Sequence, residues 1–591
     1  MTRRLADLEP LAAMGLSLAA SGALLLHCRY LDVQVVDDAA ISVAYAMTFA
    51  AGEGLRLTPV SPPVEGFSNP LWTLLIALAG PLHLDFISFT RGLGMLLGVL
   101  APLVFAAWGP ASEGRRWRLE DALGPLLVAS VPSYASWISS GMETGLHALL
   151  LAISGVLLLR ALRRGTGRAW ALCLGLLMLT RPEGVLYAAS GAFVWLLFRR
   201  RFGREEGWAA LLGATPAGLY TLFRWAYFHA LLPNTYLAKR TLDFDLAAYL
   251  GSFARAHAPL LVLFVLFAAL ACVVGRRAHA VLAVAFASAG LAFVVYAKGD
   301  WMQGWRFCAP LVPVLATAVA SGIGVARALP SIAPRVAAIG AGALLVLLHT
   351  VTQVELSPRI KADPVLPYGF IAQWMHRYQT LLAPLGFERP LIGFPDVGGL
   401  GVDWRNAEVL DVAGLASSAI ARHWTHPAAR EDFLLSEGLP VLLAGHGPSG
   451  YLNEHPRLLK HYQPSLGTAL LLQGLSPTDD PRCPGGKRAV VGMATAELER
   501  ELARLVEQRE PEEALRLWRC ALSYRSSQHL PSLSWREQQA HAAEARMKAS
   551  EAAGQLKEAV RFGSLATLLL DGDPRLRHLT ETLRERWLAD P

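Results

Sequence analysis

Residues 33–72, VQVVDDAAISVAYAMTFAAGEGLRLTPVSPPVEGFSNPLW, contain an acidic pair, Asp37 and Asp38, a third acid, Glu65, and a run of turn-forming residues. The stretch follows the first apolar segment of a chain that is apolar over most of its length. A neighbouring like charge and poor hydration both raise the cost of ionising an acid at a membrane edge, so an acidic pair there indicates function. The alternative is that the two aspartates cap the helix predicted for AAISVAYAM, because Asp is favoured at a helix N-terminus.

Composition excludes two broad classes of protein. Of the 591 residues, 53% are hydrophobic and 17% are charged, and the mean hydropathy is +0.36. These values exclude an ordinary soluble globular protein and are typical of a polytopic membrane protein with an additional soluble part. The net charge of +7 does not indicate a nucleic-acid partner, because the basic residues fall mostly in short clusters between apolar segments. That pattern fixes orientation in a membrane.

The first apolar segment, residues 11–26, follows Arg3 and Arg4. The sequence LLLHCRY offers no small-residue cleavage site, so we expect an uncleaved first span, with the N-terminus in the cytoplasm and the acidic pair outside. The next apolar stretch, residues 70–82, is shorter than the roughly 20 residues that a span needs, and predicts a helix lying at the outer interface. Further spans, making about eleven in all, are predicted at residues 91–109, 121–139, 145–162, 168–180, 184–198, 207–228, 258–275, 279–297, 309–326 and 334–354.

Charge supports this topology. If residues 70–82 are not counted as a membrane span, all the arginine clusters fall on the cytoplasmic side of the membrane. If that stretch is counted as a span, every cluster falls on the outer side instead. The clusters are residues 115–118, 163–168, 199–204, 276–277 and 327–335. The segments predicted to face outward with the acidic pair are residues 141–145, 180–184, 231–240, 297–307 and everything after about residue 354.

Polar side chains are concentrated in these outer segments. Basic residues normally favour the cytoplasmic side of a membrane protein, so the cations in the outer segments need another explanation. An anionic ligand such as a phosphate or pyrophosphate would explain them, because Arg and Lys bind such groups. Snorkelling side chains or contacts with lipid headgroups are the alternative. The cations are Arg181, Lys239, Arg240, Lys298 and Arg306.

Three outer segments supply candidate ligand-binding residues. Arg181 and Glu183 follow one predicted helix in TRPEG and form either a phosphate contact or a local ion pair. The segment LLPNTYLAKR places Asn234, Tyr236 and Lys239 after a helix ended by Pro233. The segment KGDWMQGWRF adds Lys298, Asp300, Trp301 and Arg306, although its tryptophans are also typical of a membrane interface.

The C-terminal part changes in composition. The chain is predicted to divide into a membrane domain over residues 1–356, an α/β domain over residues 357–490, and a helical end-piece over residues 491–591. Tetratricopeptide-type hairpins are conceivable in the end-piece, but no clean 34-residue repeat is present. Both C-terminal parts are expected outside the cytoplasm, where Cys483 and Cys520 could pair if the compartment is oxidising.

Several short motifs together carry a family resemblance. The ordered series VDDAAISVAYAMTFAAGEGL, PVEGFSNPLW, SGMETGLHALL, LTRPEG, LLPNTYLAK, KGDWMQGWRF and IGFPDVGGLG…LDVAGLA extends from about Asp37 to Leu415. It resembles polytopic GT-C glycosyltransferases, and especially the terminal arabinofuranosyltransferase branch that uses polyprenyl-phosphate donors. No P-loop, GxSxG, HExxH or CxxC motif argues for a nucleotide-dependent, hydrolytic or metalloprotease alternative.

The resemblance implies a polyprenyl-phosphate sugar donor, an inverting displacement, and a glycan or lipid acceptor at the periplasmic face of a bacterial plasma membrane. Asp37 or Asp38 would be the base and Glu65 would lie near the acceptor. A carboxylate with a raised pKa suits the removal of the acceptor's proton. The other aspartate could position a partner or a metal, so a divalent cation stays open.

Arg181, Lys239 and Arg306 are the implied phosphate ligands. Ala40 and Val43 stand where the family pattern suggests larger or polar residues, so arabinofuranose and other pentoses or hexoses all remain open. Two other classes also remain: a transporter or flippase of lipid-linked sugars, and a non-catalytic scaffold for envelope assembly. A transporter would place ionisable or helix-breaking residues near the middle of its spans, whereas here they gather at one face.

Overall fold

The structure, a computed structural model of the whole chain, describes residues 2–165, 167–199, 203–240, 244–273, 277–327, 329, 331–425, 427–437, 439–443, 460–464 and 469–589. The chain divides into two compact units. Unit 1 consists of residues 1–39, 68–220 and 242–367, and unit 2 of residues 40–67, 221–241 and 368–591. The domain boundaries predicted after residues 356 and 490 stay predictions.

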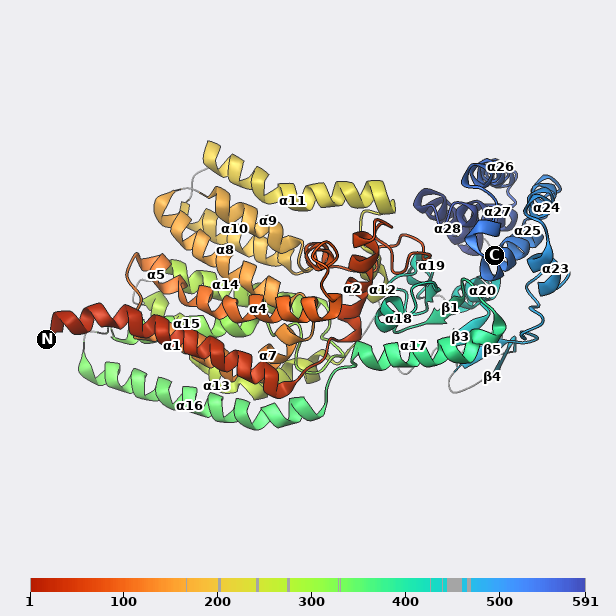
Figure 1. Cartoon of the computed structure of the whole chain (residues 1–591). Coiled ribbons are helices and arrows are strands. Elements are labelled where there is room, and N and C mark those ends of the chain that lie inside the picture. The colour runs from red at the N-terminus through yellow and green to blue at the C-terminus, as the bar shows by residue number, and fades with distance from the viewer. Residues whose placement is uncertain are drawn as a thin grey trace. The chain divides into compact units, whose positions relative to one another are not determined.

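Unit 1 is built from helices (Figure 1). They are α1 (Thr2–Leu31), α3 (Pro70–Ala77), α4 (Phe86–Ala106), α5 (Trp108–Glu113), η1 (Leu119–Ala122), α6 (Leu123–Ser130), α7 (Pro132–Ser139), α8 (Thr144–Arg164), α9 (Arg168–Met178), α10 (Gly184–Arg199), α13 (Leu246–Val273), α14 (Arg277–Tyr296), α15 (Leu311–Arg327) and α16 (Ile332–Ala362). Two further helices, α2 (Asp37–Ala50) and α11 (Arg204–Phe228), contribute residues to both units.

Length and hydropathy identify the candidate membrane spans. Five described helical segments are long and apolar enough to cross a bilayer: Leu8–Leu31, Phe86–Glu113, Thr144–Arg164, Leu246–Leu270 and Ile332–Ala362. Four shorter apolar helices are Arg168–Met178, Gly184–Arg199, Ala280–Tyr296 and Leu311–Arg327. The predicted membrane-protein fold is thus present, while the total of about eleven spans stays a prediction.

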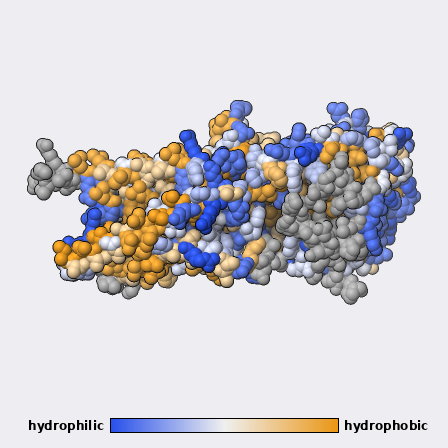
Figure 2. All heavy atoms as spheres, turned by 90° about the horizontal axis from the view of Figure 1, so that it is seen from below, coloured by the Kyte–Doolittle hydropathy of each residue, from blue (hydrophilic) through white to orange (hydrophobic). Residues whose placement is uncertain are grey.

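The outer surface of α16 shows why such a helix needs lipid around it. Figure 2, a view from below, shows broad apolar surface on the side of the molecule that carries α16, the lowest helix in Figure 1. Among the large apolar side chains that α16 leaves exposed are Val336, Leu344, Leu347, Val351 and Val354. A soluble protein rarely exposes a patch of this kind, and a bilayer removes it from water.

One predicted span is not a single continuous helix. The sequence predicts a single span over residues 121–139, but α6 ends at Ser130 and α7 begins at Pro132. Val131 between them has extended backbone angles, φ −88° and ψ 108°. Proline lacks an N–H and restricts the residue before it to extended conformations, so Pro132 interrupts the helix.

The stretch predicted to form a short interfacial helix does begin a helix at Pro70, and α3 is only eight residues long. At about 1.5 Å per residue it is about 12 Å long, far less than the thickness of a bilayer core. Its length agrees with its exclusion from the predicted spans, and both that exclusion and its place at the outer interface stay predictions.

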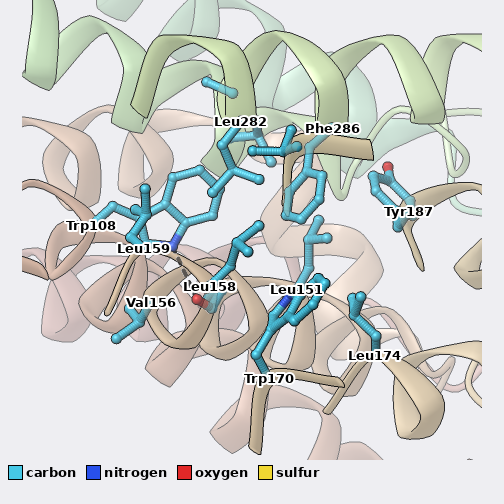
Figure 3. Packing of buried hydrophobic residues seen from close by; sticks show 14 of the residues in the cluster. Trp108, Leu151, Val156, Leu158, Leu159, Trp170, Leu174, Tyr187, Leu282 and Phe286 are labelled. Carbon is cyan, nitrogen blue, oxygen red and sulfur yellow. Dashed lines mark hydrogen bonds between the residues drawn. The ribbon is translucent and has the colours of Figure 1, made fainter. Parts of the chain in front are cut away.

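Trp108 belongs to a large buried cluster in unit 1, drawn in Figure 3. Its indole Nε1 donates a hydrogen bond to the carbonyl oxygen of Ala152, at 3.0 Å, and its ring packs edge-on against Phe286. Gly155, one turn further along α8, lies directly against the indole, so a Cβ at that position would overlap the ring. A glycine at position 155 is what lets the helix approach Trp108 so closely.

Unit 2 contains a five-stranded mixed sheet in the order β2-β1-β3-β5-β4. The strands are β1 (Leu391–Phe394), β2 (Glu408–Asp411), β3 (Val441–Leu443), β4 (Tyr462–Pro464) and β5 (Ala469–Leu472). β1 is parallel to β2 and β3, and β5 is antiparallel to β3 and β4. The sequence runs PLIGF, AEVLDVAG and PVLLAG, predicted as strands, contain β1, β2 and β3.

Short helices accompany the strands of unit 2, and a run of longer helices follows them. They are α12 (Asn234–Lys239), α17 (Tyr368–Leu382), η2 (Ala383–Leu385), α18 (Val397–Asp403), α19 (Ser418–Arg422), α20 (Pro427–Glu437), α23 (Lys487–Gly492), α24 (Thr495–Glu507), α25 (Pro511–Tyr524), η3 (Ser527–His529), α26 (Leu533–Ala552), α27 (Leu556–Leu569) and α28 (Pro574–Ala589). A disulfide joins Cys483, before α23, to Cys520 in α25.

Candidate functional site

Arg306 organises one group of polar side chains in unit 1. It lies in the loop between α14 and α15, where Lys298, Gly299, Gly304 and Trp305 all have positive φ and fold the loop into tight turns. Its Nη1 donates to Asp38 Oδ2 at 3.1 Å and its Nη2 donates to Asp300 Oδ1 at 3.0 Å.

Asp300 faces the guanidinium with both carboxylate oxygens, because its Oδ2 also lies 2.9 Å from Arg306 Nε. The Arg306 and Asp300 side chains are 5% and 2% exposed, whereas Asp38 is 23% exposed. Arg306 therefore links a buried acid to a more accessible one.

Arg181 organises a second group. It lies in the turn between α9 and α10, where it forms a short ion pair with Glu183 and donates to Glu143 Oε1 at 2.8 Å. Glu143 Oε2 accepts a hydrogen bond from Asn69 Nδ2 at 2.7 Å. The local ion pair considered from the sequence is thus present, and Glu143 joins it from the N-terminus of α8.

The two groups meet at Phe307. The guanidinium carbons of Arg306 and Arg181 lie 4.8 Å and 5.6 Å from the centre of its ring. A cation over an aromatic face within about 6 Å is attracted by it. We call the six residues Asp38, Glu143, Arg181, Glu183, Asp300 and Arg306 the acid–arginine cluster. The outer segments predicted at residues 141–145, 180–184 and 297–307 therefore come together around one ring.

Burial alone would lower the pKa of both guanidiniums in this cluster. For Arg181 the carboxylates of Glu183 and Glu143 more than reverse this effect, and its pKa is raised. For Arg306 the carboxylates of Asp300 and Asp38 do the same. Both arginines thus stay charged although their side chains are almost completely buried.

The acidic pair forms the first two residues of α2, and the capping alternative stays a prediction. Asp37 is buried, and its backbone N–H donates to the carbonyl oxygen of Leu366 at 3.1 Å. Val36 donates to the carbonyl oxygen of Ser140 at 3.0 Å and forms an isolated bridge with Pro367. Two other segments of unit 1 thus hold the start of α2 in place, and Asp38 in addition pairs with Arg306.

A cavity of about 190 Å³ adjoins the start of α2 and the loop that carries Arg306. Val36, which lines it, directly precedes the acidic pair, and Gln303 and Gly304, which also line it, lie between Asp300 and Arg306. Trp137 forms another wall and donates its indole N–H to the carbonyl oxygen of Gly304 at 2.7 Å. A small ligand in this cavity would lie beside the backbone segments that carry Asp38 and Arg306.

Four of the predicted binding residues are exposed. Lys298 and Trp301 lie in the loop that carries Arg306, and Tyr236 and Lys239 lie on α12 in unit 2. The Trp301 side chain is 57% exposed, as expected of a residue at a membrane interface. The binding role of all four residues stays a prediction.

The remaining predicted residues lie in unit 2 and are buried. Glu65 accepts two hydrogen bonds from Arg224, from Nε at 2.5 Å and from Nη2 at 3.1 Å, so the solvated loop acid considered from the sequence is wrong. Asn234 donates through Nδ2 to the carbonyl oxygens of Gly414 and Leu415, both at 2.7 Å. Asn234 therefore fixes the turn that follows β2.

That turn surrounds an acid that sequence analysis did not select. Asp411 is fully buried and accepts backbone hydrogen bonds from Ala413 and Gly414 through Oδ1 and from Ala416 through Oδ2. Burial raises the pKa of Asp411 to about 7, although these N–H donors pull it down. Its place in LDVAGLA, one of the motifs that carry the resemblance, was the available signal.

Glu143, Asn69 and Arg224 were also not selected as site residues. Glu143 lies in an outer segment of the predicted topology, which was a usable signal, whereas nothing local distinguishes the other two. Within the described part of the chain, no group of three or more His, Cys, Asp or Glu side chains is placed to hold a metal ion.

Comparisons with known proteins bear on this geometry. No protein-family model matches the chain. A curated protein, the terminal beta-(1->2)-arabinofuranosyltransferase of Mycobacterium tuberculosis, is 27% identical over 222 residues, covering 35% of this chain and 35% of that protein. The match thus spans about a third of the relative's length.

Two crystal structures of ArnT from Cupriavidus metallidurans are similar to the chain. The one bound to undecaprenyl phosphate has a TM-score of 0.52 at 14% identity, covering 78% of this chain and 99% of ArnT. The apo structure has a TM-score of 0.52 at 13% identity, covering 78% of this chain and 98% of ArnT. The likeness at this identity establishes the fold, and with the curated match it confirms the resemblance of this chain to the GT-C glycosyltransferases and their arabinofuranosyltransferase branch.

Proposed function

We propose that the protein is a membrane glycosyltransferase that transfers a sugar from a polyprenyl-phosphate donor to a glycan or lipid acceptor of the cell envelope. The sugar is arabinofuranose or another pentose or hexose. Support comes from the ArnT-like fold, from the fact that one ArnT structure is bound to undecaprenyl phosphate, and from the partial match to an arabinofuranosyltransferase.

The observation that carries the proposal is the pairing of Asp38 with Arg306 beside a cavity. A base is needed to take the proton of the acceptor hydroxyl, and a cation is needed to stabilise the departing phosphate. Asp37 and Asp38 at the start of α2 supply carboxylates, and Arg306 supplies the cation 3.1 Å from Asp38. The arrangement therefore places both chemical roles on neighbouring side chains.

The proposed reaction is a single displacement. The acceptor oxygen attacks the anomeric carbon from the face opposite to the phosphate, and the bond from that carbon to the phosphate oxygen breaks. The configuration inverts, and the hydroxyl proton passes to Asp37, with Asp38 as the other candidate. The polyprenyl phosphate leaves with the bonding electrons and is stabilised by Arg306 and Arg181.

We place the reaction at the outer face of a bacterial plasma membrane crossed by about eleven spans, with the N-terminus in the cytoplasm. The arginine clusters between apolar segments support this orientation. The Cys483–Cys520 disulfide supports a periplasmic C-terminal part, because disulfides persist in oxidising compartments. Unit 2, with Glu65 and Asn234, would then face the acceptor.

The test uses purified full-length protein with labelled polyprenyl-phosphate pentoses and hexoses and an envelope glycan acceptor. Asp37→Asn and Asp38→Asn are compared with Asp85→Asn, a matched control, because Asp85 lies at the start of another helix and caps α4 by accepting from Ser88 N–H at 2.7 Å. Loss of a general base costs about 10²–10⁴ in rate, so at least one of the two variants should lose about 100-fold or more. Asp85→Asn should keep the parent rate.

A measurement of stability distinguishes a catalytic role of the two aspartates from a role in capping α2. If the aspartates only cap α2, Asp37→Asn and Asp38→Asn will lower the melting temperature and leave the rate of the folded fraction unchanged. Transfer at the parent rate by both correctly inserted variants would refute the proposed role of the acidic pair.

A further inference from the structure

A second cavity, of about 490 Å³, lies in unit 1 at the other end of α8. Its lining includes four arginines and a tryptophan, which define what we call the arginine cavity: Arg115, Trp117, Arg160, Arg163 and Arg164. Its volume falls within the roughly 300–1,000 Å³ range of small-molecule sites. Neither the acidic pair nor the acid–arginine cluster contributes to this cavity.

One arginine of the cavity is neutralised and three are not. Arg115 is held by Asp121 through two hydrogen bonds of 2.7 Å and by Glu113 at 2.8 Å. Among the residues that the structure describes, Arg160, Arg163 and Arg164 form no ion pair with an acid. The Arg115 side chain is therefore a fixed part of the wall. The last two turns of α8 supply three guanidinium charges that no described acid neutralises, although Arg163 Nη1 donates a hydrogen bond to the carbonyl oxygen of Ala111 at 3.5 Å.

The length of α8 separates this cavity from the acid–arginine cluster. The helix has 21 residues, with Glu143 just before its first residue and Arg164 at its end. At 1.5 Å per residue it is about 31 Å long, which matches the roughly 30 Å hydrocarbon core of a bilayer. The two sites thus lie at opposite ends of α8, about 31 Å apart, and one anion cannot contact both.

We propose that the arginine cavity binds the phosphate headgroup of an anionic phospholipid. Guanidinium groups bind phosphate oxygens bidentately, and basic pockets at helix ends attract anionic headgroups. Trp117 is of the type that lies at the headgroup level. Leu96 and Leu100, two to three turns before the end of α4, are exposed and offer apolar surface to acyl chains. A lipid satisfies both the charge and the apolar surface, which a free phosphate does not.

This inference does not depend on glycosyl transfer. Lipids at a cytoplasmic surface are attracted to basic side chains by about fivefold in affinity for each Lys or Arg. Replacing three arginines by glutamine should therefore weaken headgroup binding by about a hundredfold.

The experiment measures lipid retention by native mass spectrometry on full-length protein released from nanodiscs that contain equal amounts of phosphatidylglycerol and phosphatidylcholine. We expect the parent to retain phosphatidylglycerol in preference to phosphatidylcholine. The triple variant Arg160→Gln, Arg163→Gln and Arg164→Gln should bind short-chain phosphatidylglycerol about a hundredfold more weakly. The corresponding triple lysine variant should bind within about fivefold of the parent, because it keeps the charge.

A matched control removes three arginines from the same end of the membrane region but outside the cavity: Arg168→Gln, Arg199→Gln and Arg204→Gln. It should bind within about threefold of the parent. If the first triple variant fails to insert, the single variants Arg160→Gln and Arg164→Gln, each about fivefold weaker, provide the same test.

Three outcomes would overturn the inference. The first is equal retention of phosphatidylglycerol by the parent and the cavity variant. The second is an equal loss in the control variant, which would indicate a diffuse surface charge effect. The third is complete displacement of the lipid by millimolar inorganic phosphate, which would assign the cavity to free phosphate.

Discussion

Replacing Arg306 by glutamine should destabilise unit 1 strongly. The substitution leaves the Asp300 carboxylate, 2% exposed, without the guanidinium that faces both of its oxygens, and removes the contact with Asp38. Breaking a buried ion pair by removing one partner costs about 3–5 kcal/mol, because a buried charge is left uncompensated. The burial of Asp300 places the expected loss within this range.

A second substitution, at Asp300, tests whether the uncompensated charge causes the loss of stability. In the double variant Arg306→Gln/Asp300→Asn the uncompensated charge is absent, so the loss of stability should be smaller than in Arg306→Gln alone. The coupling energy from the complete cycle should be about 2–3 kcal/mol, towards the upper end for residues in one ion-pair network. Stability is measured by reversible unfolding in mixed micelles titrated with sodium dodecyl sulfate.

Arg168→Gln is the matched control for this cycle. Arg168 also faces a carboxylate with two hydrogen bonds, to Glu205 at 2.6 Å and 3.1 Å, but the side chains are 53% and 42% exposed. An exposed pair contributes about 0–1 kcal/mol. The reasoning fails if Arg306→Gln costs no more than Arg168→Gln, or if removing Asp300 does not relieve the loss.

Three further predictions concern packing, cross-linking and pH. Gly155→Ala should cost about 1–3 kcal/mol in unfolding, because its Cβ would overlap Trp108, whereas Gly340→Ala, with open space around it, should be neutral or slightly stabilising. Cys483→Ser should lower the free energy of unfolding by about 3–4 kcal/mol, as expected for a disulfide that closes a 37-residue loop, and reductant should then lower the melting temperature of the parent but not of the variant. The pKa of Asp411 in the folded protein, about 7, lies above its ordinary value of 3.8, so the folded state holds the proton more tightly than the unfolded state. The free energy of unfolding should therefore fall as pH rises from about 4 to 7. A curve of unfolding free energy against pH for the parent that is parallel to the curve for Asp411→Asn would contradict this.

The sequence predicted the long helices and three strands because their signals are local. Apolar stretches of span length became α4, α8 and α16, and short β-rich runs became β1 to β3. The break at Val131 was missed because hydropathy summed over residues 121–139 ignores Pro132, which lacks the N–H that would continue the helix and restricts Val131 to an extended conformation.

The site was predictable in part, since topology alone places several outer loops at one face. That argument anticipated that the segments carrying Arg181 and Arg306 meet, and both guanidiniums contact Phe307. It did not identify Glu143 as the second partner of Arg181, because the choice among nearby acids depends on rotamers and distances that a pattern does not contain. The Cys483–Cys520 pair was likewise left open, because sequence spacing does not fix the distance between two thiols.

The charge balance of the acid–arginine cluster constrains how a donor phosphate could bind there. Four carboxylates share two guanidiniums, which leaves a formal excess of two negative charges before any ligand arrives. A phosphate would thus have to take over contacts that acids now make. The Arg306 contact with Asp38 is the one most open to exchange, because Asp38 is 23% exposed while Asp300 is 2% exposed. On the proposed function, a phosphate that replaces Asp38 on Arg306 would leave Arg306 paired with Asp300 and release the Asp38 carboxylate. Donor binding would then free Asp38, the alternative to Asp37 as the base, only when there is a sugar to transfer.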